Sequence, residues 1–269
     1  MLIKFGQIIL EYLTLIRSSN LSNAGILTNS ATLITQSGVA SNSALVSVFG
    51  TLYVGSNCTI YPYSYPTNSS APLFTMRDLL VATGGTINAD AKGYASNLGT
   101  GHGISGSGAG YGGQGGQELY SVNHWAGGIT YGSSNAPVDP GSGGGKMLYD
   151  VYGGGLVTVQ ASGNVRIDGT ITANGQSDLV DRSGGGSGGG IYIKCWKFYG
   201  GGSLSANGGS TVNYSGGGGG GGRIAVWMQA PLHTVSNTVN GGIGYDSTGQ
   251  VGTVVFGLLP PPGTIWTVQ

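Results

Sequence analysis

The stretch SGGGGGGGRIAVWMQA, residues 215–230, sets seven consecutive glycines directly before a run of strong strand formers. Ordering a glycine in regular structure costs about 0.5–1 kcal/mol relative to alanine, so an ordered run must recover this cost through close backbone packing and saturated hydrogen bonds. The alternative is a flexible surface linker. We expect ordered packing, because glycine runs recur in step with the strands that follow them.

The same order of segments recurs along the chain. The asparagines of TANG, SANG and TVNG are residues 174, 207 and 240, which gives a spacing of 33 twice. Ahead of them lie LVTVQA (156–161), IYIKCW (191–196) and RIAVWM (223–228), which align at Val157, Ile191 and Ile224. Alternate residues of these strands are apolar in every copy, as expected of strands half-buried on a common core. One such unit cannot bury its apolar face alone, so the copies must stack.

The sequence therefore predicts an all-β fold, a parallel β-solenoid with a repeat of about 33 residues and coils about 4.8 Å apart. The glycine runs are expected to form one wall of each coil, in a threefold conformation resembling polyproline II. Helices are not expected, because glycine interrupts every window beyond the first 16 residues.

Three regions are predicted. Residues 1–75 form β-rich N-terminal coils and an assembly segment, residues 76–257 carry the glycine-rich repeats with an expanded loop at 91–152, and residues 258–269 form a proline-rich extended tail. The N-terminal residues MLIKFGQIILEYLTLIRSS show neither a recognisable cleavage site nor an apolar stretch long enough to span a membrane.

Composition excludes several classes of partner. The chain has 56 glycines among 269 residues, and its 10 basic and 10 acidic residues give a formal net charge of zero. Such a balance offers no electrostatic footprint for nucleic acid.

The chain has two cysteines. Cys58 and Cys195 could pair in an oxidising compartment, or each could serve as a small buried hydrophobe.

The string GGGSGGGIYIK (184–194), followed by GGGSLSANGG (200–209) and SGGGGGGGRIAV (215–226), resembles glycine-rich secreted repeat proteins of environmental bacteria and protists. The resemblance covers roughly residues 75–256. It implies a β-helical fold and a role at a surface or outside the cell, and it brings no catalytic residues.

No catalytic or cofactor chemistry is expected. Glycan-cleaving β-helices need a cluster of carboxylates on one face, and none of the ten acidic residues recurs at the repeat spacing. The three histidines have no metal-ligand spacing, and no glycine run continues as a phosphate-binding loop. We therefore expect no enzyme activity, no cofactor and no metal site.

The expanded loop contains the candidate contact residues His124, Trp125 and Tyr131. Aromatic residues among small polar neighbours suit contact with glycans or with a protein. The alternative is that these side chains pack the loop onto the solenoid.

The function predicted from sequence is that of an extracellular or cell-surface structural protein without enzyme activity. Both ends of the chain are apolar, where a solenoid normally carries polar caps, so we expect copies to assemble into filaments or a surface layer through these ends. The alternative is an adhesin that binds a receptor or a glycan, on a cell surface or at a phage tail tip.

Overall fold

The computed structural model describes residues 50–64, 71–180, 182–211, 215–231 and 233–260, together with the backbone of five short strands before residue 50. This described part is all-β, with eighteen strands and no helix. Every strand pair in it is parallel, and the strands form two sheets. The expected absence of helices is thus confirmed for the described residues.

The larger sheet has twelve strands. They are β1 (Ile8–Ile9), β2 (Asn20–Ser22), β3 (Gly25–Leu27), β5 (Leu45–Ser47), β6 (Thr51–Val54), β8 (Leu73–Met76), β9 (Asp78–Val81), β11 (Leu156–Ala161), β12 (Asn164–Ile167), β14 (Gly190–Tyr199), β16 (Arg223–Ala230) and β18 (Thr253–Leu258). The sheet contains two rows of strands, β1-β3-β6-β9-β12 and β2-β5-β8-β11. The ten-residue strand β14 joins the two rows, because its first half pairs with β11 and its last residues pair with β12.

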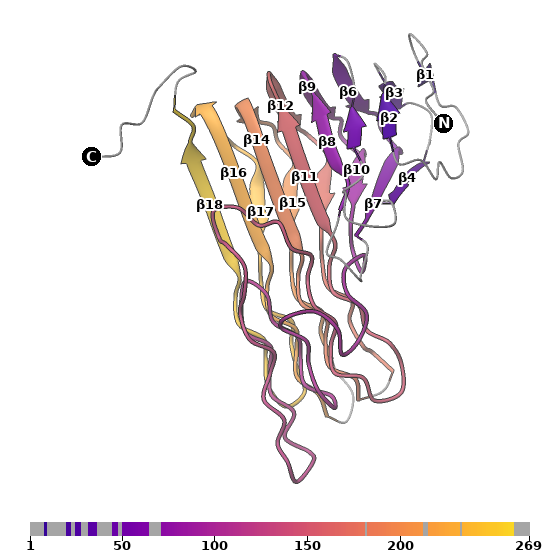
Figure 1. The fold of residues 1–269 in the computed structure, drawn as a ribbon, viewed down its shortest axis with the longest axis vertical. Coiled ribbons are helices and arrows are strands. Elements are labelled where there is room, and N and C mark those ends of the chain that lie inside the picture. The colour runs from indigo at the N-terminus through magenta and orange to yellow at the C-terminus, as the bar shows by residue number, and fades with distance from the viewer. Residues whose placement is uncertain are drawn as a thin grey trace.

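The smaller sheet has six strands. They are β4 (Thr32–Gln36), β7 (Thr59–Tyr63), β10 (Thr86–Asn88), β13 (Thr170–Thr172), β15 (Ser203–Ser205) and β17 (Ser236–Thr238). Within each row the strands lie side by side in chain order, from indigo to yellow in Figure 1. Two sheets of parallel strands visited in turn by the chain are compatible with a β-solenoid.

The register agrees with the alignment made from the sequence. Val157 pairs with Ile191, and Ile191 pairs with Ile224. The asparagines form a hydrogen-bonded ladder, in which the Oδ1 atom of Asn174 accepts from the backbone amide of Asn207 at 2.8 Å and that of Asn207 accepts from Asn240 at 2.8 Å. Both bonds of the ladder join residues that are 33 apart in the sequence, which is compatible with the predicted spacing.

The core consists of columns that take one side chain from each strand. One column crosses the larger sheet through Phe74, Val159, Ile193, Val226 and Phe256. The first four are fully buried, and Phe256 packs against them partly buried. Each fully buried side chain of this size contributes about 1.5–3 kcal/mol relative to leaving it exposed.

The glycine runs have a threefold hydrogen-bonding pattern. The backbone amides of Gly217 and Gly220 donate to carbonyl oxygens of the segment 106–109. The amides of Gly218 and Gly221 donate to the segment 247–250, and those of Gly219 and Gly222 donate to the segment 206–209. All six bonds are 2.7–3.0 Å long. Three residues per turn is the period of polyproline II, and none of these six glycines has a positive φ. This period of three residues is compatible with the threefold conformation predicted for the run.

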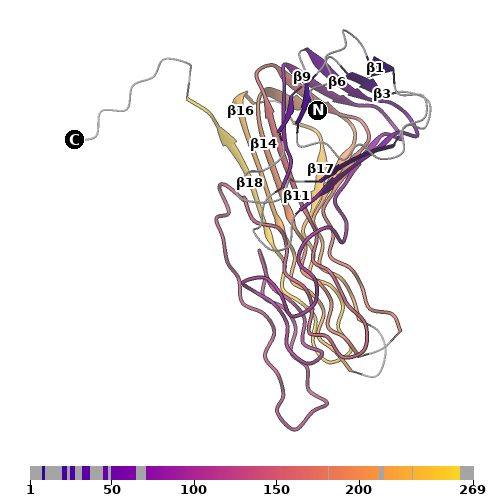
Figure 2. The same ribbon diagram turned by 45° about the vertical axis from the view of Figure 1, so that its right-hand side comes forward.

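The position of the glycine runs differs from the expected wall. Figures 1 and 2 show the strands at one end of an elongated molecule and the glycine-rich segments continuing beyond them. The run 217–222 hydrogen-bonds to six other segments, which lie at residues 106–109, 112–116, 185–188, 206–209, 242 and 247–253. A segment without side chains can accept neighbours on all sides, so these runs form a bundle rather than a single layer.

The expanded loop is part of this bundle. No strand lies between β10 and β11, and residues 106–116 of the loop run among the glycine segments. We call the assembly of residues 101–116, 127–129, 141–145, 153–155, 184–189, 206–209, 217–222, 239–242 and 248–252 the glycine bundle.

Candidate functional site

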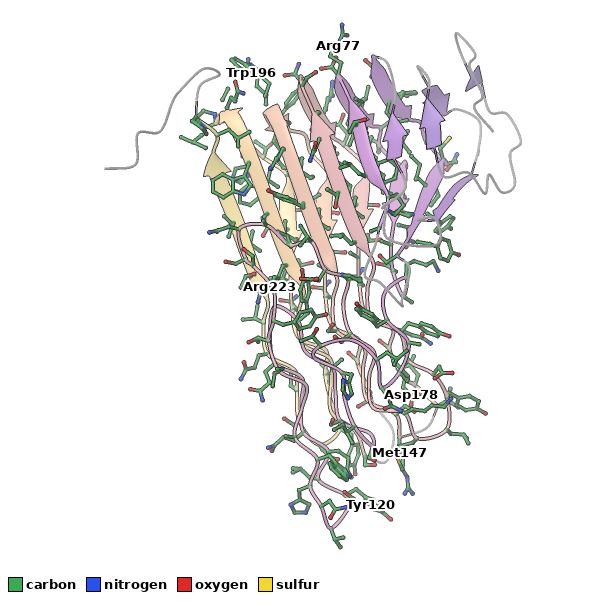
Figure 3. All side chains as sticks on the ribbon, in the orientation of Figure 1. Arg77, Tyr120, Met147, Asp178, Trp196 and Arg223 are labelled. Atoms are coloured by element: carbon green, nitrogen blue, oxygen red, sulfur yellow. The ribbon has the colours of Figure 1, made fainter. Side chains whose placement is uncertain are left out.

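The loops at the end of the molecule farthest from the strands form the candidate site. We call residues 117–126, 146–150, 177–180, 182–183 and 243–247 the distal loops. Figure 3 shows Tyr120, Met147 and Asp178 at this end, Arg77 and Trp196 at the opposite end, and Arg223 between them. Because the loops follow directly from the glycine bundle, its packing fixes where they emerge.

Two of the three candidate contact residues lie in the distal loops. His124 is exposed and Trp125 is half-buried. The backbone amide of Glu118 donates to the carbonyl of Trp125 at 2.9 Å, and the amide of His124 donates to the carbonyl of Ser121 at 3.2 Å. These bonds close a compact loop that presents His124 to solvent.

Tyr131 is not brought together with the other two. Its hydroxyl donates to the carbonyl of Pro140 at 2.7 Å and accepts from the Ser142 hydroxyl at 2.9 Å, and its ring lies 4.7 Å from that of Tyr111. Burial raises the pKa of Tyr131 well above its usual value, so the hydroxyl stays protonated and keeps its donor role. The Tyr131 side chain thus packs parts of the expanded loop against one another.

Glu118 organises the loop that carries His124 and Trp125. Its carboxylate accepts from the amide and from the hydroxyl of Ser121, both at 2.6 Å, and only 3% of the residue is exposed. Burial alone would raise the pKa of Glu118, but hydrogen bonds from Ser121, Tyr120 and Trp125 hold the pKa below its usual value. The carboxylate is therefore ionised at neutral pH and acts as a cap for the turn.

Two further carboxylates connect the distal loops to one another. Asp246 accepts from the amides of Leu119 at 2.9 Å and Gly216 at 3.1 Å, which joins loops far apart in the sequence. Asp178 accepts from the amides of Val180 at 3.0 Å and Ser183 at 2.9 Å. Each carboxylate thus satisfies backbone donors of tight turns, and such bonds are stronger than those between neutral groups.

The outer surface of the distal loops is apolar and aromatic. Its exposed large side chains are Leu119, Tyr120, Val122, Met147, Leu148, Tyr149, Leu179, Val180, Ile243 and Tyr245. Val122 is 96% exposed, and the guanidinium of Arg182 lies 4.6 Å from the ring centroid of Tyr120. Single exposed hydrophobes are ordinary, but a gathering of this kind at one end of a molecule marks an interaction surface.

Most of these side chains were not identified from the sequence. Leu179, Val180, Ile243 and Tyr245 lie two to five residues after the glycine of the Asn-Gly pair in their repeat, so the asparagine ladder could have located them. The amide of Ser210 bonds to the hydroxyl of Ser177, and the amide of Ile243 bonds to that of Ser210, which extends the stacking into these loops.

The described residues hold no group of three or more His, Cys, Asp or Glu side chains that could bind a metal ion. Cys58 and Cys195 are both buried and not joined by a disulfide. Burial raises the pKa of the Cys195 thiol to about 12, so this thiol is protonated and unreactive at neutral pH.

No family model matches the chain, and neither a curated protein sequence nor a solved structure is detectably similar to it. Within its described part, the chain has no helix of the length and hydropathy needed to cross a membrane.

Proposed function

We propose that the protein is a β-solenoid with an appended glycine bundle, and that it works outside the cell as a binding protein without enzyme activity. In this proposal the strands and the glycine bundle are a rigid support, and the distal loops contact the partner. Binding residues commonly sit on loops held by a rigid scaffold.

The observation that carries the proposal is the exposure of apolar side chains on loops whose backbones are held in place. Glu118, Asp178 and Asp246 accept backbone hydrogen bonds inside the turns, while the large side chains around them point to solvent. Loops held in this way lose little conformational entropy when they bind, which favours affinity.

A protein partner fits this surface better than a glycan does. Of the ten large hydrophobic side chains exposed on the distal loops, seven are Leu, Val, Ile or Met and carry no group that would bond to a sugar hydroxyl. Apolar area of this kind is stabilised by burial against another apolar surface. We therefore propose a protein on the surface of another cell as the partner.

The proposal is tested by binding of the fluorescently labelled protein to intact bacterial cells from a panel of environmental strains. The double variant Tyr120→Ser, Val122→Ser should bind at least about tenfold more weakly, because two exposed anchors are lost without a change in the core. Val138→Ser is the matched control, since Val138 is 55% exposed but lies outside the distal loops.

Treatment of the cells separates the two kinds of partner. Binding to a protein should be lost after the cells are treated with protease and should survive mild periodate oxidation of their glycans. The opposite pattern, or equal binding by both variants, would contradict the proposal.

Self-assembly into filaments or a surface layer is the second candidate, and one observation favours it. Among the described residues β18 pairs only with β16, so its other edge presents unpaired backbone groups that could accept another strand. The apolar segment expected at the start of the chain lies mostly outside the described residues. Sedimentation velocity over a wide concentration range decides the matter, because a monomer that persists at high concentration excludes assembly.

A further inference from the structure

A groove lies at the end of the larger sheet opposite the distal loops, near the carboxyl ends of β8, β11 and β16. Its volume is about 540 Å³, within the range of small-ligand sites. Residues of β8, β11, β14 and β16 line it, and Leu259 closes one side. Trp196 belongs to this groove, and Figure 3 places it far from Tyr120.

The register of the strands sets a row of polar side chains along the groove. Thr75 pairs with Gln160 and Gln160 pairs with Lys194, so these three residues stand next to one another on neighbouring strands. Neighbouring strands lie about 4.8 Å apart, so the backbone positions that carry this hydroxyl, amide and ammonium group are evenly spaced. The Lys194 ammonium lies 5.2 Å from the ring centroid of Tyr192 on the same face.

An aromatic platform accompanies this row. Trp196 lies where β14 passes from its pairing with β11 to its pairing with β12, and it is 44% exposed. An exposed indole face beside hydrogen-bonding groups suits a ligand with both an apolar face and hydroxyl groups. No acidic residue lines the groove.

Gln229 lines the groove, and its amide oxygen is unsatisfied. Its Oε1 atom is shielded from solvent and has no hydrogen-bond partner within the described part of the chain. An unsatisfied buried polar atom costs about 1–3 kcal/mol, so a native structure normally supplies a partner. A ligand hydroxyl can donate or accept, and would satisfy the amide in either orientation once its terminal bond turns toward the groove.

We propose that this groove binds an unbranched neutral oligosaccharide that lies across the strands, with one sugar ring against Trp196. Thr75, Gln160, Lys194 and Gln229 supply donors and acceptors to its hydroxyl groups. The ligand is bound and not cleaved, because glycoside hydrolysis needs a pair of carboxyl groups and none lines the groove. The site is separate from the distal loops and does not depend on the function proposed for them.

Isothermal titration calorimetry of the full chain with cellohexaose, laminarihexaose and mannohexaose tests the proposal. At least one of these hexasaccharides should bind saturably, and Trp196→Ala should weaken that binding at least about tenfold because the stacking platform is lost. Gln160→Ala should weaken it by a smaller factor. Trp196 is exposed, so its variant should fold, which circular dichroism and thermal unfolding verify.

The double variant Tyr120→Ser, Val122→Ser serves as the control at the other end of the molecule and should bind the hexasaccharide as the parent chain does. Failure of all three hexasaccharides to bind at millimolar concentration would overturn the proposal. So would binding that survives Trp196→Ala, or binding that is lost in the control variant.

Discussion

At Gly219 two backbones approach so closely that no side chain fits between them. A β-carbon built there would overlap the carbonyl oxygen of Gly186. The amide of Gly219 also donates to the carbonyl of Gly209 at 2.8 Å, so the segment cannot move away without breaking that bond. Glycine is required at this position because of its small size. Its presence makes the unfolded chain more flexible, which increases the conformational entropy lost on folding.

The first prediction compares two glycines. Gly219→Ala should lower the free energy of unfolding by about 3 kcal/mol, since the added methyl group forces packed backbones apart. A β-carbon at Gly201 would meet nothing within 4 Å, so Gly201→Ala should leave the free energy of unfolding within about 1 kcal/mol of the parent value. Urea unfolding of the three proteins measures both changes, and equal stabilities would show that the glycine bundle is loosely packed.

At the scale of an element, the loop 117–126 depends on an ionised carboxyl group. The folded structure lowers the pKa of Glu118 below its usual 4.5, because hydrogen bonds to the carboxylate outweigh the effect of burial. A lowered pKa in the folded state stabilises the fold fully above the pKa of the unfolded chain. This stabilisation is lost as the pH falls through the lowered value.

The second prediction follows from the lowered pKa of Glu118. Glu118→Gln should lower the free energy of unfolding by about 1–2 kcal/mol at pH 7, and the difference from the parent chain should shrink toward zero in acid. Asp150→Asn is the control, because Asp150 is exposed and forms a surface ion pair with the exposed Lys146, so its effect should stay below about 1 kcal/mol at neutral pH. A difference for Glu118→Gln that grows on acidification would show that the pKa is raised instead.

Elements differ in how far they could be predicted from sequence. The strands and the asparagine ladder were predictable, because apolar alternation and the recurring Asn174, Asn207 and Asn240 both report contacts between adjacent copies. The packing of the glycine bundle was not predictable. Its contacts join segments as distant as Gly106 and Gly217, and residues without side chains leave no pattern that would identify their neighbours.

The same reason explains the outcome for the candidate site. His124 and Trp125 fall at the distal end because the loop that carries them turns back there. The sequence around Tyr131 resembles in composition that around His124 and Trp125, yet the Tyr131 ring lies against Tyr111 and its hydroxyl donates to the carbonyl of Pro140. Which aromatic residue is buried depends on the path of the expanded loop through the bundle, and local sequence does not encode that path.

At the scale of the whole molecule, Arg223 joins the strands to the expanded loop. Arg223 is only 7% exposed, and it follows the seven-glycine run as the first residue of β16. The guanidinium donates to the carbonyls of Tyr131 at 2.7 and 3.0 Å and Tyr111 at 3.2 Å, and to the hydroxyl of Thr253 at 3.0 Å. A planar group with fixed donors can serve three partners at once, which an ammonium group on a flexible stem does poorly.

The last prediction concerns this junction. Arg223→Lys should lower the free energy of unfolding by about 1–3 kcal/mol, because buried carbonyls lose their donors. Amide exchange around Tyr111 and Tyr131 should also become faster, since the loop is released from the strands. Arg166→Lys is the matched control, because the Arg166 side chain is 52% exposed beside Asp168 and such surface pairs contribute about 0–1 kcal/mol. Equal effects of the two substitutions on stability and exchange would show that the strands and the loop hold together without Arg223, and that the distal loops are positioned by the glycine bundle alone.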